Sequence, residues 1–391
     1  MNENNDRKIK VLYIDHAAAY PEEQKKYQVL SERTELEILL IRPSKWIDTG
    51  RIEQFEVQDP AHKFRVVFAN TLFSGYRHRS FFTNNIGRII KEFQPDILHL
   101  FEEANTFFSF QAFLLKRLFS PSIKLIFDNF QNIISEHVDY KFHRLYEFIE
   151  KLVFQDSVCA TVRYDGSREF LEYRKYNKPI YELPWGTDIS QFKRVDATRI
   201  REKHGMDGFT IGYIGRVEAS KGILLLIEAL SKLNENIKLL VIGTGSAEQK
   251  MHQLIQKLNL SERVIVAGYV SHAELPAFYS AVDCVVVPTI TVGRCKEQFG
   301  RVLIEAMACE TAVIGSTSGA IPSVIGEAGL IFRENDPDDL TEKIQLLTTN
   351  HDLKEKLAYA GKERVLQNYT WQKFSARCSE IYQVVLNGSN K

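Results

Sequence analysis

Residues 209–243, FTIGYIGRVEASKGILLLIEALSKLNENIKLLVIG, decide the fold that the sequence predicts. The stretch opens on a short apolar run, passes through a glycine-bearing turn, continues as the helical pattern GILLLIEALSKL and closes on a second apolar run, IKLLVIG. A strand, a crossover helix and a second strand in this order are typical of a parallel sheet. We therefore expect a βαβ unit here.

The same alternation of strand and helix continues through both halves of the chain. In the second half, the further expected strands are RVIVAGY, DCVVVP, AVIGS and GLIF. In the first half they are KVLYID, LEILLI, FRVVFA, PDILHLF, IKLIFD and VCATV, with helical patterns such as RSFFTNNIGRIIKEF and FQAFLLKRLF between them. The pattern predicts an α/β fold with two Rossmann-like, doubly wound domains.

The chain length fits this division, because 391 residues exceed one domain of ordinary size. The turn-rich, charged segment at 183–199 is the expected boundary. We predict an N-terminal domain over residues 1–190 and a C-terminal domain over residues 191–369. The amphipathic segment at about 370–391 is expected to form a helix that joins the N-terminal domain.

The composition is that of a globular protein, with 44% hydrophobic and 26% charged residues. Fifty basic residues balance fifty acidic ones, so no global charge attracts nucleic acid. The five cysteines are scattered without metal-ligand spacing, which favours free thiols in a reducing compartment. The polar N-terminus lacks a signal-peptide core, and no window reaches the ~18 apolar residues of a membrane span. A soluble, cytoplasmic protein is expected.

The stretch KEQFGRVLIEAMA, residues 296–308, contains the first candidate site. We expect a helix to start at Gly300, and the unpaired N–H groups and partial positive charge of a helix start favour an anion such as phosphate. Glu297 precedes that anion and Glu305 follows it inside the helix, an arrangement that suits a nucleotide sugar. The alternative is a solvated loop glutamate and a glutamate on the helix surface.

Three further glycine-bearing turns follow strands, and ligands of open α/β sheets bind at the carboxyl ends of strands. Gly215 ends one strand and is followed by Arg216 and Lys221, two cations that can neutralise a diphosphate without a metal. Gly243 and Gly245 form a second turn, which is a weak dinucleotide fingerprint. The segment STSGAIP, residues 316–322, forms the third.

These motifs together resemble the retaining, nucleotide-sugar-dependent glycosyltransferases of family 4, also called glycosyl transferases group 1. The resemblance rests on GRVEASKG, VIGTGS, VAGYVSHAELPAFYSAVDCVVVPT, EQFGRVLIEAMA, GSTSGAIPSVIGEAGLIF and LPWGTDISQF, and it includes the E-x7-E signature of the family. It implies the GT-B architecture, in which two Rossmann-like domains face a central cleft.

Carried over by position, the resemblance implies a nucleoside-diphosphate sugar as the donor. It names Glu297, Arg216 and Lys221 as catalytic residues, with Arg216 and Lys221 on the diphosphate, Glu297 on the donor sugar and Glu305 on the ribose. The other implied donor-binding residues are Gly215, Gly243, Gly245, Tyr269, Phe299, Gly300, Arg301 and Val302. The family generally uses neither metal nor cofactor, and front-face attack passes the proton of the acceptor to a phosphate oxygen of the leaving group.

The sequence departs from the family pattern at a few positions. Glu310 and Ala312 replace a common glycine and proline, and Ser323 stands where many members have Glu. In the first half, the loop HAAAYP lacks the usual Gly-Gly turn, and IFDNFQNI lacks the histidine often found after the fifth strand. The acceptor side is therefore the least constrained by the resemblance.

In the N-terminal domain, side chains at expected strand ends are candidates for the acceptor. The candidates are His16, His99, Glu102, Glu103, Asn129, Gln131 and Asn132. His99 alternates with leucines, so a hydrogen-bonded core histidine is the alternative. The stretch 76–93 mixes cations with phenylalanines, which fits an ordinary amphipathic helix or one that contacts a membrane at its inner face.

The sequence therefore predicts a metal-independent, retaining glycosyltransferase, with a glycan, a lipid-linked molecule or a small molecule as acceptor, in bacterial cell-surface glycan synthesis. The alternatives are a non-catalytic sugar-nucleotide-binding partner of another enzyme and an NAD-dependent oxidoreductase, which the incomplete glycine fingerprint disfavours. The acidic run DPDD, residues 336–339, resembles a metal motif, but its place before a helical pattern favours helix capping.

Overall fold

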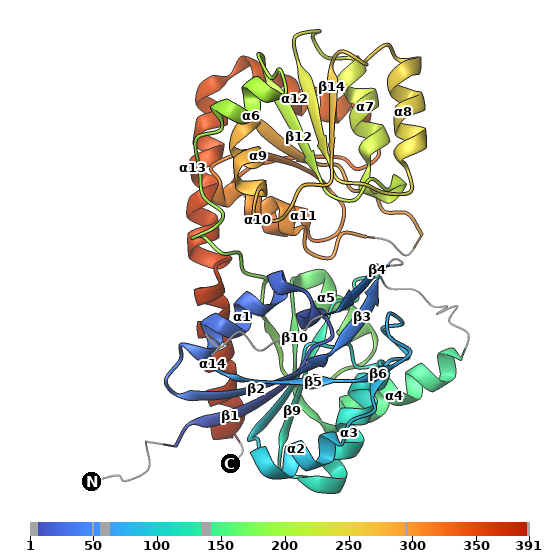
Figure 1. Ribbon diagram of the computed structural model, residues 1–391, viewed down its shortest axis with the longest axis vertical. Helices are drawn as coiled ribbons and strands as arrows, with labels where there is room; N and C mark the ends of the chain where they lie inside the picture. Colours follow the sequence, from blue (N-terminus) through green and yellow to red (C-terminus); the bar gives the residue numbers. More distant parts are fainter. Residues whose placement is uncertain (1–6, 49–50, 55–62, 134–141, 294–295, 389–391) are drawn as a thin grey trace. The chain divides into compact units, whose positions relative to one another are not determined.

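The computed structural model describes residues 7–48, 51–54, 63–133, 142–293 and 296–388. The chain forms two compact units, each an α/β structure around its own sheet (Figure 1). Met1–Pro184 and Trp371–Lys391 form the first unit, which we call the N-terminal unit. Trp185–Thr370 form the second, the C-terminal unit.

The N-terminal unit is built on a seven-stranded parallel sheet of order β11-β10-β9-β8-β1-β2-β5. Its strands are β1 (Ile9–Ile14), β2 (Leu36–Pro43), β5 (Arg65–Ala69), β8 (Ile97–Leu100), β9 (Lys124–Asn129), β10 (Ser157–Val162) and β11 (Ile180–Glu182). The central strands are apolar runs whose residues are almost all buried, because helices cover both faces of a parallel sheet.

Helices and two small hairpins complete this unit. The helices are η1 (Ala17–Ala19), α1 (Pro21–Ser31), α2 (Ile86–Phe93), α3 (Phe107–Phe119), α4 (His143–Asp156), α5 (Asp165–Tyr173) and α14 (Trp371–Asn387). The hairpins pair β3 (Lys45–Asp48) with β4 (Arg51–Gln54), and β6 (Thr71–Leu72) with β7 (Phe81–Phe82). The pattern RSFFTNNIGRIIKEF predicted one helix, but only α2 is helical, because the Asn85 side chain caps it by accepting a bond from the Arg88 N–H.

Helix α14, which comes last in the chain, packs into the interior of the N-terminal unit. The Tyr382 hydroxyl lies 2.6 Å from that of Tyr13 in β1 and 2.7 Å from Nδ1 of His99 in β8. All three side chains are fully buried. A buried polar group is costly unless it is hydrogen-bonded, so this chain of contacts fixes how α14 sits on the sheet.

The C-terminal unit has a six-stranded parallel sheet of order β14-β13-β12-β15-β16-β17. The strands are β12 (Thr210–Ile214), β13 (Lys238–Ile242), β14 (Val264–Gly268), β15 (Cys284–Val287), β16 (Ala312–Ser316) and β17 (Leu330–Phe332). The strand order reverses between β12 and β15. Such a switch point is where the ligands of open α/β sheets bind, outside the carboxyl ends of the strands.

Helices flank this sheet on both faces (Figure 1). They are α6 (Thr198–Lys203), η2 (Ala219–Lys221), α7 (Ile223–Ser231), α8 (Glu248–Lys257), α9 (Leu275–Ala281), α10 (Arg301–Ala308), α11 (Ile321–Ile325), α12 (Pro337–Thr349) and α13 (His351–Asn368). The capping interpretation of DPDD is confirmed, because the Asp336 carboxylate accepts bonds from the N–H groups of Asp338 and Asp339 at the start of α12.

Four of the five cysteines lie in the described part of the chain. Cys159, Cys284, Cys309 and Cys378 are buried free thiols, as expected, while Cys295 lies outside the described residues. Burial raises the pKa of the Cys159 thiol to about 12 and that of the Cys378 thiol to about 12. In the described residues, no helix combines the length and apolar character that crossing a bilayer requires.

Candidate functional site

Two tight glycine turns bring the polar segments of the C-terminal unit together. Gly222 follows η2 with φ of +72°, and a Cβ there would lie 1.8 Å from the backbone oxygen of Pro288, just after β15. Gly319 has φ of +60°, and its Cβ would lie 1.9 Å from the backbone oxygen of Glu297. Only glycine permits these backbone approaches. They bring Lys221 and the turn after β16 against the segment that precedes α10.

Lys221 and the segment that precedes α10 line one cavity of about 270 Å³ at the carboxyl ends of β12 and β15, and the turn after β16 is not part of its lining. Of the sequence-predicted residues, Gly215, Arg216, Lys221, Glu297, Phe299, Gly300, Arg301 and Val302 line it. The same walls contain residues that the sequence did not single out, among them Trp185, Tyr213, Thr289 and Gln298. Arg216, Lys221, Glu297 and the start of α10 therefore lie on the wall of one cavity.

A lysine, a glutamate and a threonine form the polar centre of this cavity. The Lys221 ammonium lies 2.7 Å from Glu297 Oε2, and the Thr289 hydroxyl donates to the same oxygen over 2.8 Å. The Glu297 side chain is 12% exposed and that of Lys221 is 28% exposed. Charge-assisted contacts of this kind fix the carboxylate in one orientation while both charges stay accessible from the cavity.

The start of α10 lies beside this pair on the wall of the cavity. Gly300 precedes the helix with φ of +81°, in the left-handed region, so the helix begins at Arg301 as the sequence predicted. The first N–H groups of a helix have no partner within it and carry a partial positive charge. An anion bound here would face those donors and the Lys221 ammonium.

Arg216 is the more exposed of the two predicted cations. Its side chain is 64% exposed and pairs with Glu218 at 2.8 Å. The buried Tyr213 hydroxyl donates to the Arg216 carbonyl over 2.6 Å. Burial raises the pKa of Tyr213, so the phenol stays protonated and holds the backbone of the Arg216 turn in place.

Glu305 lies apart from the cavity lining. It is 6% exposed, and its Oε2 accepts a 2.8 Å hydrogen bond from the buried Tyr279 hydroxyl. Its Oε1 lies 3.6 Å from Nε2 of His272. Burial, together with the neighbouring Glu305 carboxylate, raises the pKa of Tyr279, which therefore remains a donor.

The contacts of Gln191 fix the proton on the His272 ring. Gln191 Nε2 donates to the His272 backbone oxygen over 2.9 Å and lies 3.2 Å from Nδ1 of the same residue. A carbonyl oxygen only accepts, so the Gln191 amide must present its nitrogen, and not its oxygen, to His272. One hydrogen of this NH₂ group goes to the His272 backbone oxygen and the other goes to His272 Nδ1. The neutral ring then carries its proton on Nε2, the atom that faces Glu305.

The other predicted donor residues do not line the cavity either. Gly243 donates its N–H to the Gly268 oxygen over 2.7 Å, and Gly245 donates to the Glu248 carboxylate over 2.6 Å. Tyr269 is 69% exposed. These residues belong to the ends of β13 and β14, on the other side of β12 from β15.

In the N-terminal unit, the predicted acceptor residues separate into an edge group and an interior group. His16 follows β1, and its Nδ1 lies 2.6 Å from Glu102 Oε1 after β8. Glu103 accepts a 2.9 Å bond from Gln131 and lies 3.4 Å from Arg77. These side chains lie together at the carboxyl ends of the strands.

The remaining candidates make structural contacts. His99 is fully buried among β8, β10 and α14, away from that edge. The Asn129 side chain donates to the backbone oxygens of Gln131 and Ser167 at 3.1 and 3.0 Å. Asn132 is 7% exposed.

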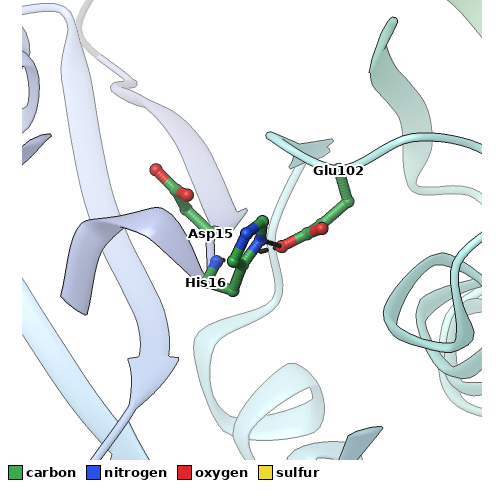
Figure 2. A group of neighbouring side chains, drawn as sticks. All are labelled: Asp15, His16 and Glu102. Carbon is green, nitrogen blue, oxygen red and sulfur yellow. Dashed lines mark hydrogen bonds and ion pairs between the residues drawn. The ribbon is translucent and has the colours of Figure 1, made fainter. Parts of the chain in front are cut away.

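One cluster in the described residues has metal-compatible spacing, with donor atoms of Asp15, His16 and Glu102 within 4.8 Å of one another. Figure 2 shows the Glu102 carboxylate against the His16 ring, while the Asp15 carboxylate points away from both. Asp15 Oδ2 contacts the Lys26 ammonium at 2.7 Å and accepts from the Tyr27 hydroxyl at 2.7 Å, and Oδ1 accepts from the Ala17 N–H at 2.8 Å. With its charge met by Lys26, Asp15 does not fit a metal ligand.

Comparison with known proteins shows what the C-terminal unit is similar to. Residues 196–364 match the family model described as Glycosyl transferases group 1. These residues are therefore similar to the domain of that family. The match contains every cavity-lining residue except Trp185.

Curated relatives are also described as glycosyltransferases. The chain is 32% identical over 213 residues to the capsular polysaccharide biosynthesis glycosyltransferase CapM of Staphylococcus aureus, covering 52% of this chain and 54% of that protein. It is 28% identical to a GDP-mannose-dependent alpha-(1-6)-phosphatidylinositol monomannoside mannosyltransferase of Mycolicibacterium smegmatis, covering 58% and 62%. The chain spans about half the length of the curated relatives it matches.

Solved structures match almost the whole chain. A sucrose-phosphate synthase from Thermosynechococcus elongatus has a TM-score of 0.76 at 19% identity, covering 97% of this chain and all of that one (100%). A glycosyltransferase from Rickettsia africae has a TM-score of 0.74 at 19% identity, covering 97% and 99%. The fold is therefore GT-B.

Proposed function

We propose that the chain transfers a sugar from a nucleoside-diphosphate sugar to an acceptor hydroxyl, with retention at the anomeric carbon and without a metal. The C-terminal unit binds the donor, and the N-terminal unit binds the acceptor. One observation carries the proposal: Lys221, Glu297 and the start of α10 lie in one cavity at the switch point of the sheet.

The donor diphosphate binds at the start of α10, where the backbone N–H groups and the Lys221 ammonium receive its charge. Arg216 adds a second cation from the turn after β12. Glu297, held by Thr289, accepts hydrogen bonds from the hydroxyls of the donor sugar. Glu305 binds the ribose diol, since a carboxylate oxygen that already accepts one bond has a second lone pair.

In the reaction, an acceptor oxygen forms a bond to the anomeric carbon while the bond from that carbon to the phosphate oxygen breaks. The departing nucleoside diphosphate carries the electron pair. Cations and helix N–H groups already in place stabilise the charge that develops on it, which lowers the barrier. Attack from the face that the diphosphate leaves gives retention.

We further propose cell-surface glycan assembly in the cytoplasm of a bacterium. CapM is named for capsular polysaccharide biosynthesis, and two structural neighbours are described as lipopolysaccharide glycosyltransferases. The buried free thiols support a reducing compartment. A further neighbour was solved in complex with UDP and glucose, which makes a UDP-sugar the first donor to try.

The test is the thermal stability of the purified chain with UDP-, GDP-, ADP- and dTDP-sugars in the presence of EDTA. A donor at 100 times its dissociation constant stabilises the native state by about 2.7 kcal/mol. We expect a shift with one nucleotide class and a strongly reduced shift in Lys221→Ala and Glu297→Ala. Lys232→Ala is the matched control, because this exposed lysine pairs with Asp338 away from the cavity. A folded sample that shifts with no sugar nucleotide would refute the proposal.

A further inference from the structure

A second cavity of the C-terminal unit lies at the opposite edge of the sheet from the cavity that contains Lys221 and Glu297. Its volume is about 700 Å³, which is in the range of small-molecule sites, about 300–1,000 Å³. Phe209 directly precedes β12 and Ile237 directly precedes β13, so this cavity lies at the amino ends of these strands. The second half of α12 forms another of its walls. We call it the amino-end cavity.

The loop before β13, which forms part of the amino-end cavity, is fixed by contacts within the protein. The Arg263 guanidinium donates to the backbone oxygens of Leu230, Asn234 and Ile237 at 3.0, 2.9 and 3.0 Å. The Asn234 Oδ1 accepts from the Asn236 N–H over 3.2 Å. A loop that is already ordered loses little conformational freedom when a ligand binds. The walls of this cavity are therefore prepared for a ligand.

The polar lining of the amino-end cavity combines carboxamides, hydroxyls and one carboxylate. These residues are Asn234, Asn236, Gln345, Thr348, Thr349 and Glu342. Within the described part of the chain, the side chains of Asn236, Gln345 and Glu342 form no hydrogen bond or ion pair. A carboxamide both donates and accepts, whereas an ionised carboxylate only accepts. These three groups can bond to the hydroxyls of a ligand without breaking a contact inside the protein.

Apolar side chains stand beside these polar groups. Phe209 is half-buried against the core of the unit, and Leu346 on α12 is 41% exposed. Small-molecule sites characteristically combine apolar walls with a few polar groups that orient the ligand. A sugar ring carries hydroxyls around its edge and C–H groups on its faces, so it matches both parts of this lining.

The charges of the amino-end cavity disfavour an anionic ligand. Among the described residues that line it, Glu342 is the one charged side chain. Lys354, whose ammonium lies 5.7 Å from the centre of the Phe209 ring, pairs with Asp283 at 2.8 Å. Sites for phosphate normally present an arginine or a lysine to it, and a carboxylate repels it. The lining therefore suits a neutral ligand and not a nucleotide.

We propose that the amino-end cavity is a second saccharide site, which binds a neutral sugar unit of a glycan and does not react with it. The side chains of Asn236, Gln345 and Glu342 bond to the sugar hydroxyls. Phe209 and Leu346 contact the C–H groups of the ring. This inference goes beyond the proposed function, because binding here requires neither a sugar nucleotide nor transfer.

The two cavities of this unit can be occupied at the same time. Strand β12 has five residues and lies between them, and at about 3.3 Å per residue it spans about 16 Å. A sugar unit in the amino-end cavity therefore cannot reach a donor bound beside Lys221 and Glu297. It would instead hold a distant part of a glycan on the protein, which raises the local concentration of that glycan.

The test is saturation-transfer difference NMR of the full-length chain. The probes are the methyl glycosides of glucose, galactose, mannose and N-acetylglucosamine, together with neutral disaccharides of these sugars. We expect at least one probe to bind, and Asn236→Ala or Gln345→Ala to raise its dissociation constant by roughly 2–10-fold, the loss of one hydrogen bond. The double variant should lose the signal. Gln253→Ala, an exposed carboxamide on α8, is the matched control.

Two further comparisons test the place and the chemistry of the site. Glu297→Ala should bind the saccharide as wild type does, and UDP-glucose should not displace it. Glucose 6-phosphate should bind more weakly than methyl glucoside, and Glu342→Gln should reduce that difference. Preferential binding of the phosphorylated sugar would overturn the neutral assignment.

The remaining outcomes decide the proposal and keep it separate from the proposed function. A folded chain that binds none of the probes would overturn it. Binding that the double variant retains, or that Glu297→Ala alone abolishes, places the saccharide elsewhere and also overturns it. A chain that binds a neutral saccharide in the amino-end cavity but no sugar nucleotide would refute the proposed function and leave this inference standing.

Discussion

At the scale of single residues, Thr289 shows how much the donor site depends on a side chain with no charge. Its hydroxyl donates to the Glu297 oxygen that also contacts Lys221. Without that donor, the carboxylate can turn fully onto the lysine, so that both charges are less available to a ligand. Orientation of the glutamate is therefore a property of the three residues together.

Thr289→Val removes the hydroxyl and keeps the shape. We expect donor affinity to fall about 10-fold, since a hydrogen bond to a charged group contributes about 1.5–3 kcal/mol. Isothermal titration with the stabilising sugar nucleotide measures this. Thr348→Val, on the exposed face of α12, should bind as wild type. Equal affinity for the two variants would mean that Thr289 does not position Glu297.

Tyr279 also donates a hydrogen bond to a glutamate, and in this case both side chains, Tyr279 and Glu305, are buried. Tyr279→Phe leaves the buried carboxylate without its 2.8 Å donor. The free energy of unfolding should fall by about 1–3 kcal/mol, which urea denaturation would measure. Tyr359→Phe, exposed on α13, should leave it unchanged. If the Tyr279 variant is as stable as wild type, the Glu305 carboxylate has another donor in solution.

At the scale of elements, the contact of β8 with α14 through His99 predicts a dependence of stability on pH. Burial lowers the pKa of His99, although Asp128 partly opposes this, and Arg163 and Lys26 add to the lowering. The unfolded state then binds the proton more readily than the folded one. Stability is full above the unfolded pKa of about 6.5 and is lost as pH falls below it, by up to about 1.4 kcal/mol per pH unit.

His99→Gln removes this titration while keeping a polar group beside Tyr382. Denaturation at pH 7.5, 6.5 and 5.5 should give a shallower decline for His99→Gln than for wild type. The exposed His143→Gln variant should keep the wild-type slope. A His99→Gln slope that equals the wild-type slope would show that other groups carry the pH dependence.

Tight turns between elements give a matched pair of glycine variants. Gly222→Ala places Cβ 1.8 Å from the Pro288 oxygen, whereas Gly205, with φ of +60°, has nothing within 4 Å of its Cβ position. Both variants carry the strain of a positive φ, roughly 1 kcal/mol, but only Gly222→Ala must also move β15 away from η2. Denaturation should show the larger loss for Gly222→Ala, and equal losses would contradict the close approach.

Most strands could be predicted from the sequence, because a parallel strand that is buried on both faces consists of a continuous run of apolar residues. Strands β8, β12 and β15 are examples. The predicted start of α2 was wrong. The helical pattern of the sequence extends to residues before Asn85, but the Asn85 side chain caps the helix and α2 begins at Ile86. The hairpin of β3 and β4 was not predicted, because short antiparallel pairs have no helix-strand alternation to reveal them.

The candidate site was predictable where it follows strand ends, and not elsewhere. Arg216, Lys221 and Glu297 lie in one cavity because the carboxyl ends of neighbouring parallel strands meet at one edge of the sheet. Thr289 follows β15 directly, so the same rule could have found it. The contact of Gln191 with His272 spans 81 positions of sequence, and no local pattern encodes it.

At the scale of the whole molecule, the chain forms two compact units, and one of them is assembled from two separate segments of the sequence. The C-terminal unit is one continuous segment, whereas the N-terminal unit needs residues from both ends of the chain. Folding of the first unit therefore depends on α14, and folding of the second does not.

This division predicts the behaviour of fragments. An excised segment of residues 185–370 should fold and bind the stabilising sugar nucleotide within a few-fold of the full chain, since every cavity residue lies in it. A fragment of residues 1–184 should be poorly folded, because it lacks Tyr382 and the rest of α14. Circular dichroism and titration would measure both. Cooperative folding of 1–184 alone would contradict the role of α14.

The most direct test of the central claim is to follow, by proton NMR, one sugar nucleotide incubated with the purified chain in EDTA. A transferase should consume the donor, release the nucleoside diphosphate and give a first product with the donor's anomeric configuration, and Lys221→Ala and Glu297→Ala should abolish this. A chain that binds the donor but never consumes it, with water or any hydroxyl acceptor, would contradict the account and identify a sugar-nucleotide-binding protein without transfer activity.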